Sequence, residues 1–390
     1  MGGRDTGGMS TFLRGLAGAL GQAGHRVDIF TRAGATEKEE TIVLAPGVRL
    51  IIINDGQGSL AKENIYPRCR LIARAVEDFT ARKKCCYDLL FSHYWLSGCV
   101  GRVLQESVRV PHLIMFHTLG RAKNECCPAE KEPLRRLAEE ERLARRCDLV
   151  VVAARLEEER VVSYFALPEE KLARITCGFD CSLFKPCGRR EARHQLGWPA
   201  EEEEKIILSA GRIEPVKDLD LLLEASALLP AEDNFSLRIA GGDEHSRARV
   251  ARLKEKAAAL GLGGKVFFEG IVDHEKMPLY YSAASLTALT SCYESFGLAA
   301  LESIACGTPV VGGYTGALPE LVGKEREAGR FGYLVESRRP DKWAAKMRAV
   351  FLGGNAPAAE EIEEHLAPFS WEEAARLLVE KCRAGLPDRL

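Results

Sequence analysis

The segment from 284 to 312 constrains the fold more than any other part of the chain. A largely apolar, strand-like run at 284–289 leads into a glycine loop, an apolar helical run follows Gly297, and 309–312 is strand-like again. Strand, loop and helix in this order form the repeating unit of a parallel sheet covered by helices. The chain is therefore predicted to be α/β.

Two carboxylates stand on this segment, Glu294 on the loop and Glu302 within the helix. The backbone N–H groups of Phe296, Gly297 and Leu298 fall at the helix N-terminus, which attracts anions, and glycine allows a ligand close to the backbone. A carboxylate one to two turns further on can accept two hydrogen bonds from a vicinal diol. A nucleoside diphosphate sugar would fit this pattern, although two glutamates taken alone are more often surface charges beside a core helix.

The composition predicts a globular chain of two domains, with 390 residues of which 46% are hydrophobic and 28% charged. A net charge of −2 does not favour nucleic-acid binding. The sequence shows no apolar run of membrane-spanning length and no signal peptide, so we expect a cytoplasmic protein. The 13 cysteines lack metal-site spacing and suit free thiols in a reducing cytosol, so we expect no metal and no cofactor.

The first half of the chain alternates strands and helices, but its first strand is missing. Gly7 and Gly8 open a loop that leads into a helix at 9–23, and such a loop normally follows the first strand of a doubly wound sheet. We therefore expect that the natural start lies upstream of Met1 or that the chain is a fragment; the alternative is a disordered start. Strand-like runs follow at 27–31, 48–53, 88–92, 112–117 and 148–153, with helical stretches such as 66–83 and 133–146.

The second half restarts this alternation. Strand-like runs lie at 206–211, 235–240, 266–269 and 332–335, and helical runs at 218–229 and 246–260. We predict an N-terminal domain over 1–186 and a C-terminal domain over 205–369.

Two cations follow the first strand of the second domain. Pro215 delays the next helix, so Arg212 and Lys217 are presented from a loop at the carboxyl edge of the strands, where open α/β sheets bind ligands. They could stabilise the charge of a leaving diphosphate without a metal, whereas an isolated Arg–Lys pair is usually surface charge. Asp218 and Asp220 formally match a metal-binding Asp-x-Asp, but they open a helix, where acidic residues act as caps.

Together these motifs resemble the retaining GT-B glycosyltransferases of family 4, which include sucrose-phosphate synthase and the inositol-phosphate N-acetylglucosaminyltransferase of mycothiol synthesis. The similarity covers nearly the whole chain and includes a glycine loop at 312–320, where Tyr314 and Thr315 depart from the plain family pattern. It implies two Rossmann-like, doubly wound domains facing a cleft, with a helix at 370–390 that crosses back to the first domain.

The resemblance also implies roles for individual residues. Catalytic roles fall to Glu294, Arg212, Lys217 and His117, the last of which would orient a sugar hydroxyl; a lone histidine is otherwise usually structural. Donor contacts fall to Gly7, Gly8, Arg212, Lys217, Glu294, Phe296, Gly297, Leu298 and Glu302. Lys62, Tyr94, Thr118 and Arg136 match residues that hold an acceptor phosphate, and the Lys62 and Arg136 matches rest on local similarity alone.

The implied reaction transfers a sugar from a nucleoside diphosphate, most simply UDP, to an acceptor hydroxyl with retention. The acceptor would be a small molecule such as a phosphorylated polyol or sugar. Front-face attack, with the leaving phosphate accepting the acceptor's proton, needs no carboxylate pair at nucleophile distance. Alternatives on the same fold are a UDP-sugar 2-epimerase and a non-catalytic nucleotide-sugar-binding protein. The sequence specifies neither the sugar, the acceptor (a lipid included) nor the oligomeric state.

Overall fold

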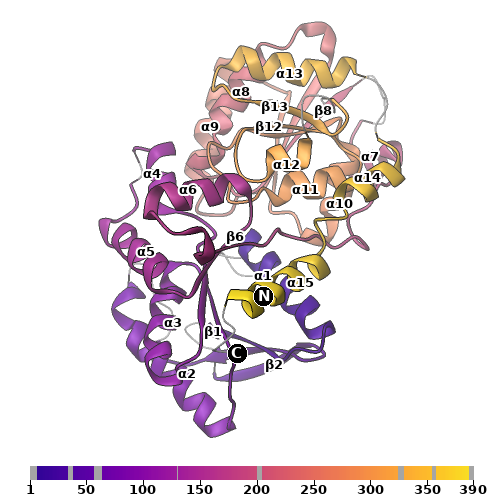
Figure 1. Cartoon of the computed structure of the whole chain (residues 1–390). Coiled ribbons are helices and arrows are strands. Elements are labelled where there is room, and N and C mark those ends of the chain that lie inside the picture. The colour runs from indigo at the N-terminus through magenta and orange to yellow at the C-terminus, as the bar shows by residue number, and fades with distance from the viewer. Residues whose placement is uncertain are drawn as a thin grey trace. The chain divides into compact units, whose positions relative to one another are not determined.

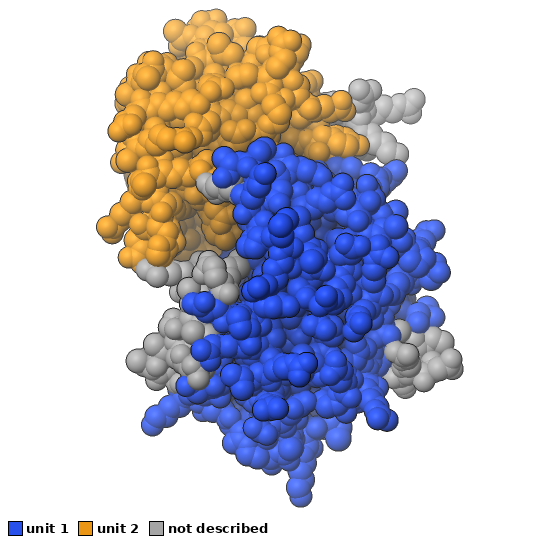
Figure 2. Space-filling model, turned by 90° about the vertical axis from the view of Figure 1, so that its left-hand side faces the viewer, with its two compact units in different colours: residues 1–178, 371–390 blue, residues 179–370 orange. Residues whose placement is uncertain are grey.

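The computed structural model describes residues 7–33, 38–56, 64–129, 131–199, 204–323, 329–353 and 357–385. It divides into two compact units (Figures 1 and 2): unit 1 comprises Met1–Gly178 and Trp371–Leu390, and unit 2 comprises Phe179–Ser370. Strands and helices alternate in both units, which confirms the predicted α/β class.

Unit 1 contains two sheets. In the first, β3 (Val48–Ile53) lies between β1 (Val27–Arg32), which is parallel to it, and β2 (Glu40–Ala45), which is antiparallel. The second sheet is parallel throughout, in the order β4 (Leu90–His93), β5 (His112–Met115), β6 (Leu149–Val152) and β7 (Leu172–Arg174). The strand expected ahead of the glycine loop concerns a part of the chain before residue 7, outside the described residues.

The helices of unit 1 are α1 (Gly8–Gln22), α2 (Cys69–Lys83), α3 (Trp95–Val108), α4 (Gly120–Cys126), α5 (Leu134–Arg146), α6 (Arg155–Phe165) and α15 (Trp371–Gly385), with a 3-10 turn at Tyr66–Arg68. The C-terminal helix α15 belongs to this unit because it packs on α1. The Phe12 and Trp371 ring centroids are 5.7 Å apart. A Cβ at Gly15 would lie 2.1 Å from Trp371 Cε2, so only glycine admits this indole.

Unit 2 is built on one parallel sheet. Its order is β10 (Val266–Gly270), β9 (Phe235–Ala240), β8 (Lys205–Ala210), β11 (Leu286–Leu289), β12 (Val310–Gly313) and β13 (Gly332–Val335). Numbered along the chain this is 3-2-1-4-5-6, the order of a Rossmann-like sheet. The helices are α7 (Arg189–Leu196), α8 (Leu219–Ala227), α9 (Arg247–Ala259), α10 (Met277–Ala283), α11 (Leu298–Ala305), α12 (Leu318–Val322), α13 (Pro340–Leu352) and α14 (Ala359–Leu366), with 3-10 turns η4 (Pro215–Lys217) and η6 (His274–Lys276) among the connections.

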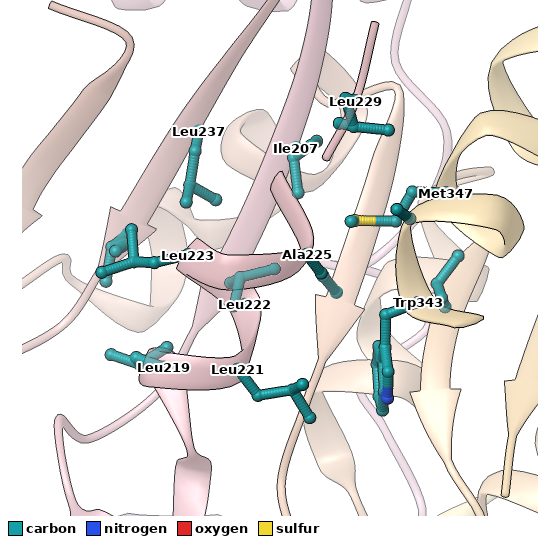
Figure 3. Close-up of a cluster of buried hydrophobic side chains, with 14 of the residues drawn as sticks. Ile207, Leu219, Leu221, Leu222, Leu223, Ala225, Leu229, Leu237, Trp343 and Met347 are labelled. Atoms are coloured by element: carbon teal, nitrogen blue, oxygen red, sulfur yellow. The ribbon is translucent and has the colours of Figure 1, made fainter. Parts of the chain in front are cut away.

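One core cluster of unit 2 lies between this sheet and the helices α8, α9 and α13 (Figure 3). Helix α8 contributes Leu219, Leu221, Leu222 and Leu223, and Trp343 from α13 is fully buried against them. Strands that are buried on both faces read as continuous apolar runs, which is why 206–210 and 286–289 were recognisable in the sequence. This packing holds the carboxyl ends of β8 and β11 in place.

Unit 1 also buries a carboxyl group, that of Glu157 in the first turn of α6. Its side chain accepts a hydrogen bond from the Ala153 N–H at 3.0 Å, and the residue is 2% exposed. Burial raises the pKa of Glu157 from 4.5 to about 7, against the opposing effects of that hydrogen bond and of Arg160. The folded protein therefore favours the protonated acid at this position.

Because the folded-state pKa is raised, Glu157 contributes stability below pH 4.5, and this contribution is lost as the pH rises through about 7. Replacing Glu157 by Gln, a neutral isostere, should raise the free energy of unfolding at pH 8 by on the order of 3 kcal/mol relative to the parent chain. At pH 4 the two proteins should be nearly equal. Urea unfolding at both pH values tests this; a difference that does not change with pH would contradict it.

Candidate active site

The sheet order of unit 2 defines where a ligand would bind. β8 pairs with β9 on one side and with β11 on the other, so the chain winds away in opposite directions from β8 and β11. In open α/β sheets, ligands bind outside the carboxyl ends of the strands at this point of reversal. The loops at 211–217 and 290–297 both begin there, and they carry the cations and the first glutamate predicted from the sequence.

An ion pair joins these two loops. Lys217 Nζ lies 2.6 Å from Glu294 Oε1, and the Ser291 hydroxyl donates to the same oxygen at 2.6 Å. The Lys217 backbone is held as well, because its carbonyl accepts a hydrogen bond from the Thr290 hydroxyl at 2.9 Å. The side chains of Lys217 and Glu294 are 24% and 13% exposed, so both are fixed by protein contacts and still reachable by a ligand.

Arg212 and the two aspartates of this region have other partners. The Arg212 guanidinium pairs with Glu214 at 2.7 Å and is largely exposed. Asp218 caps α8 by accepting a hydrogen bond from the Leu221 N–H at 3.2 Å, as predicted. Asp220 pairs with basic side chains of α9, including Lys256 at 3.0 Å. Both aspartates therefore act in capping and ion pairing on α8.

The loop that carries Glu294 is held against the second glycine loop. The Glu294 N–H donates to the Thr315 hydroxyl at 3.0 Å, and the Ala317 N–H donates to the Phe296 carbonyl at 2.7 Å. Gly316 has φ +57°, and a Cβ there would lie 2.4 Å from the Phe296 carbonyl oxygen. Thr315, which departs from the family's plain pattern, thus fixes the backbone of Glu294.

The donor residues 296–298 occupy the start of α11. Phe296 is buried and its ring lies 6.1 Å from that of Phe369, so its side chain anchors the loop and only its backbone could face a ligand. Gly297 is the N-cap residue with φ +107°, and Leu298 begins the helix. The structure therefore places the backbone N–H groups of this segment at a helix N-terminus, as predicted.

Glu302, in α11, is held by two side chains that sequence analysis did not single out. His274 Nε2 lies 2.8 Å from Glu302 Oε1, and the Tyr281 hydroxyl donates to Oε2 at 2.9 Å. These partners come from η6 and α10, more than twenty positions earlier in the chain. The only sequence signal was the place of His274 just after β10, at the carboxyl edge of the sheet.

In unit 1, His117 follows β5 and pairs with a second histidine. His93 Nδ1 and His117 Nε2 are 2.8 Å apart, and the Phe12 ring of α1 packs against both imidazoles. Burial lowers the pKa of His117 to about 3; burial and the neighbouring His117 lower that of His93 well below its usual value. Both rings are therefore neutral near pH 7, and one donates to the other.

Two further predicted donor residues, Gly7 and Gly8, lie at the start of α1. Gly7 is its N-cap residue and Gly8 its first residue. The Gly7 carbonyl accepts a hydrogen bond from the Ser10 N–H at 3.0 Å. The helix has no acidic residue in its first turn, so its N-terminal partial positive charge is not offset locally.

The predicted acceptor residues also lie in unit 1, and three of the four meet. Arg136 Nη2 donates to the Thr118 carbonyl at 2.7 Å and to its hydroxyl at 3.0 Å, and the guanidinium lies 5.0 Å from the Tyr94 ring centroid. Arg136 is 1% exposed and also pairs with Glu140 at 2.6 Å and Glu132 at 2.9 Å. A phosphate reaching this guanidinium would compete with two carboxylates. Lys62 lies outside the described residues.

The fold and this arrangement define the class of a GT-B glycosyltransferase, and solved structures agree. Sucrose-phosphate synthase from Thermosynechococcus elongatus matches at 29% identity with a TM-score of 0.85, over 97% of this chain and 94% of that one. Anabaena HepE, solved in complex with UDP and glucose, matches at 19% identity with a TM-score of 0.73, over 97% and 96% of the two chains, and supports the fold alone.

Sequence comparison gives the family. Residues 6–183 match Glycosyltransferase Family 4 and residues 190–364 match Glycosyl transferases group 1. The D-inositol 3-phosphate glycosyltransferase of Geodermatophilus obscurus is 32% identical over 96% of this chain and 84% of its own length, and that of Mycolicibacterium gilvum is 33% identical over 96% and 84%. The chain belongs to glycosyltransferase family 4 and is a glycosyltransferase.

Among the residues that the structure describes, no helix is long and apolar enough to cross a membrane.

The contact between Thr315 and the Glu294 backbone can be tested by its effect on stability. Replacing Thr315 by Val keeps the shape but leaves a part-buried N–H without its acceptor, so the free energy of unfolding should fall by about 1–3 kcal/mol. Thr315→Ser keeps the hydroxyl and should lose much less. Urea unfolding of the three proteins measures this; a loss for Ser as large as or larger than that for Val would contradict the role assigned to the hydroxyl.

Proposed function

We propose that this glycosyltransferase transfers a sugar from a UDP-sugar to a hydroxyl of a phosphorylated polyol or sugar, with retention of the anomeric configuration. The observation that carries the proposal is the Lys217–Glu294 pair at the reversal point of the unit 2 sheet, with Glu302 on the helix α11 that follows the loop of Glu294. The names of the relatives support the acceptor class, since they act on inositol 3-phosphate or make sucrose phosphate.

In this proposal the donor is held by unit 2. Glu302 accepts hydrogen bonds from the ribose hydroxyls, and the start of α11 faces the diphosphate. Lys217 and Arg212 supply the positive charge that the diphosphate needs as it leaves, so we expect no metal requirement. Glu294 faces the donor sugar, with its carboxylate orientation fixed by Lys217 and Ser291.

The chemical step is a substitution at the anomeric carbon on the face of the leaving group. The bond from this carbon to the phosphate oxygen breaks, and the bond from the acceptor oxygen forms on the same face. The acceptor's proton passes to the leaving phosphate oxygen, so no protein base is required. His117, as a neutral imidazole, could orient a sugar hydroxyl but could not neutralise the diphosphate.

We further propose that unit 1 holds the acceptor phosphate beside Thr118, Tyr94 and Arg136, and that Lys62 contributes to this site. Support comes from the convergence of three of these residues in the structure. Phosphate would accept hydrogen bonds from the hydroxyls and the guanidinium. A cytoplasmic location is also proposed, because none of the 13 cysteines, all of which lie among the described residues, forms a disulfide, and this suits a reducing compartment.

The proposal is tested by release of UDP from a panel of UDP-sugars, with inositol phosphate, fructose 6-phosphate and the unphosphorylated forms of both as acceptors. We expect release that depends on an acceptor and is strongest with a phosphorylated one; NMR of the product should show the donor's anomeric configuration. Release with unphosphorylated acceptors only would reject the phosphate site. Inversion in the product would reject the same-face mechanism.

Replacing Lys217 by Ala should lower turnover by on the order of a hundredfold, because it removes a charge that stabilises the leaving diphosphate. Lys342→Ala, an exposed lysine of α13 in the same unit, provides a matched control and should keep full activity. Initial rates at saturating donor measure the effect. Unchanged turnover in the Lys217 variant would reject the role assigned to this residue.

A further inference from the structure

Glu302 is a nearly buried carboxylate whose two oxygens each have a donor from a different element. Oε1 faces His274 Nε2 at 2.8 Å, and Oε2 accepts the Tyr281 hydroxyl at 2.9 Å. The Glu302 side chain is 9% exposed. A carboxylate held at both oxygens cannot turn about its terminal bond without breaking a hydrogen bond, so its plane is fixed.

Tyr281 is a permanent donor in this arrangement. It is 1% exposed on α10, and burial together with the nearby Glu302 raises its pKa well above the usual value. Its hydroxyl therefore stays protonated and is directed at Glu302. The Tyr281 backbone is held too, since its carbonyl accepts the Thr308 hydroxyl at 2.7 Å. The Tyr281 hydroxyl therefore holds Glu302 Oε2 in place, because Tyr281 is itself fixed in the core of unit 2.

His274 is the second donor to Glu302, and it is more exposed than Tyr281. Because an ionised carboxylate only accepts hydrogen bonds, the 2.8 Å contact requires a proton on Nε2 of His274. The imidazole packs on the buried Phe184 ring, with centroids 5.1 Å apart, while 47% of the side chain is exposed. The packing on Phe184 helps to orient this half-exposed imidazole toward Glu302.

We propose that His274 and Tyr281 are positioning residues that set the Glu302 carboxylate for two hydrogen bonds from the ribose diol of the donor. Each carboxylate oxygen has about two lone-pair sites, so one remains on each oxygen after these contacts. The two remaining sites lie in one fixed plane, which matches a pair of vicinal hydroxyls. This inference rests on the proposed function, in which Glu302 binds the ribose.

The test compares two ligands that differ only in the hydroxyls concerned. Isothermal titration calorimetry measures binding of UDP and of 2′,3′-dideoxy-UDP to the full chain and to His274→Ala, His274→Gln and Tyr281→Phe variants. We expect His274→Ala and Tyr281→Phe to weaken UDP binding about five- to tenfold and to change dideoxy-UDP binding less than twofold. His274→Gln, which can present an amide donor, should recover part of the loss.

Lys276→Ala is the matched control, because Lys276 lies in the same 3-10 turn, is 67% exposed and pairs with Asp273. It should bind both ligands as the parent chain does. Equal losses for UDP and dideoxy-UDP in the His274 and Tyr281 variants would overturn the inference and leave a structural role. Equal binding of the two ligands by the parent chain would instead reject Glu302 as the ribose site, and no UDP binding at all would reject the proposed donor.

Discussion

The Lys217–Glu294 ion pair joins the two loops that form the candidate site of unit 2, and it depends on the order of the strands beneath it. It can form only because β8 and β11 are neighbours in the parallel sheet, so that the loops leaving their carboxyl ends meet. The sheet order in turn depends on the buried faces of the strands and on the core that α8 and α13 complete. A pair that is both anchored and partly exposed keeps its charges oriented before a ligand arrives, which is the condition for electrostatic preorganisation.

The parts of the fold that sequence could predict are those whose signal is local. Strands β3 and β9 have the bounds predicted from their apolar runs, 48–53 and 235–240, because strands buried on both faces need no partner to be recognised. Strand β2 was not predicted, since all but the last of its residues are exposed and show no alternation. The arrangement of the unit 1 strands in two sheets depends on pairing between distant segments, which a local pattern does not contain.

The same distinction applies to the candidate site. Glu294, Gly297 and Glu302 lie on one strand–loop–helix segment, so their relative placement followed from the sequence. Their partners did not, because Thr315 and His274 come from loops after β12 and β10 and are brought in by the sheet. Sequence also could not show that Arg136 is buried against Glu140, a pairing that changes what a phosphate would have to displace.

Two candidate site residues of unit 1, Tyr94 and His117, have a strained backbone conformation with positive φ. Tyr94 and His117 follow the adjacent strands β4 and β5 and have φ values of +78° and +58°, a conformation that costs non-glycine residues on the order of 1–3 kcal/mol each. Local contacts hold both: the Tyr94 N–H donates to the Met115 carbonyl at 2.8 Å, and His117 is fixed by His93. Since burial also keeps His117 neutral, it can offer a directed hydrogen bond but no charge, and the cations proposed for the diphosphate come from unit 2.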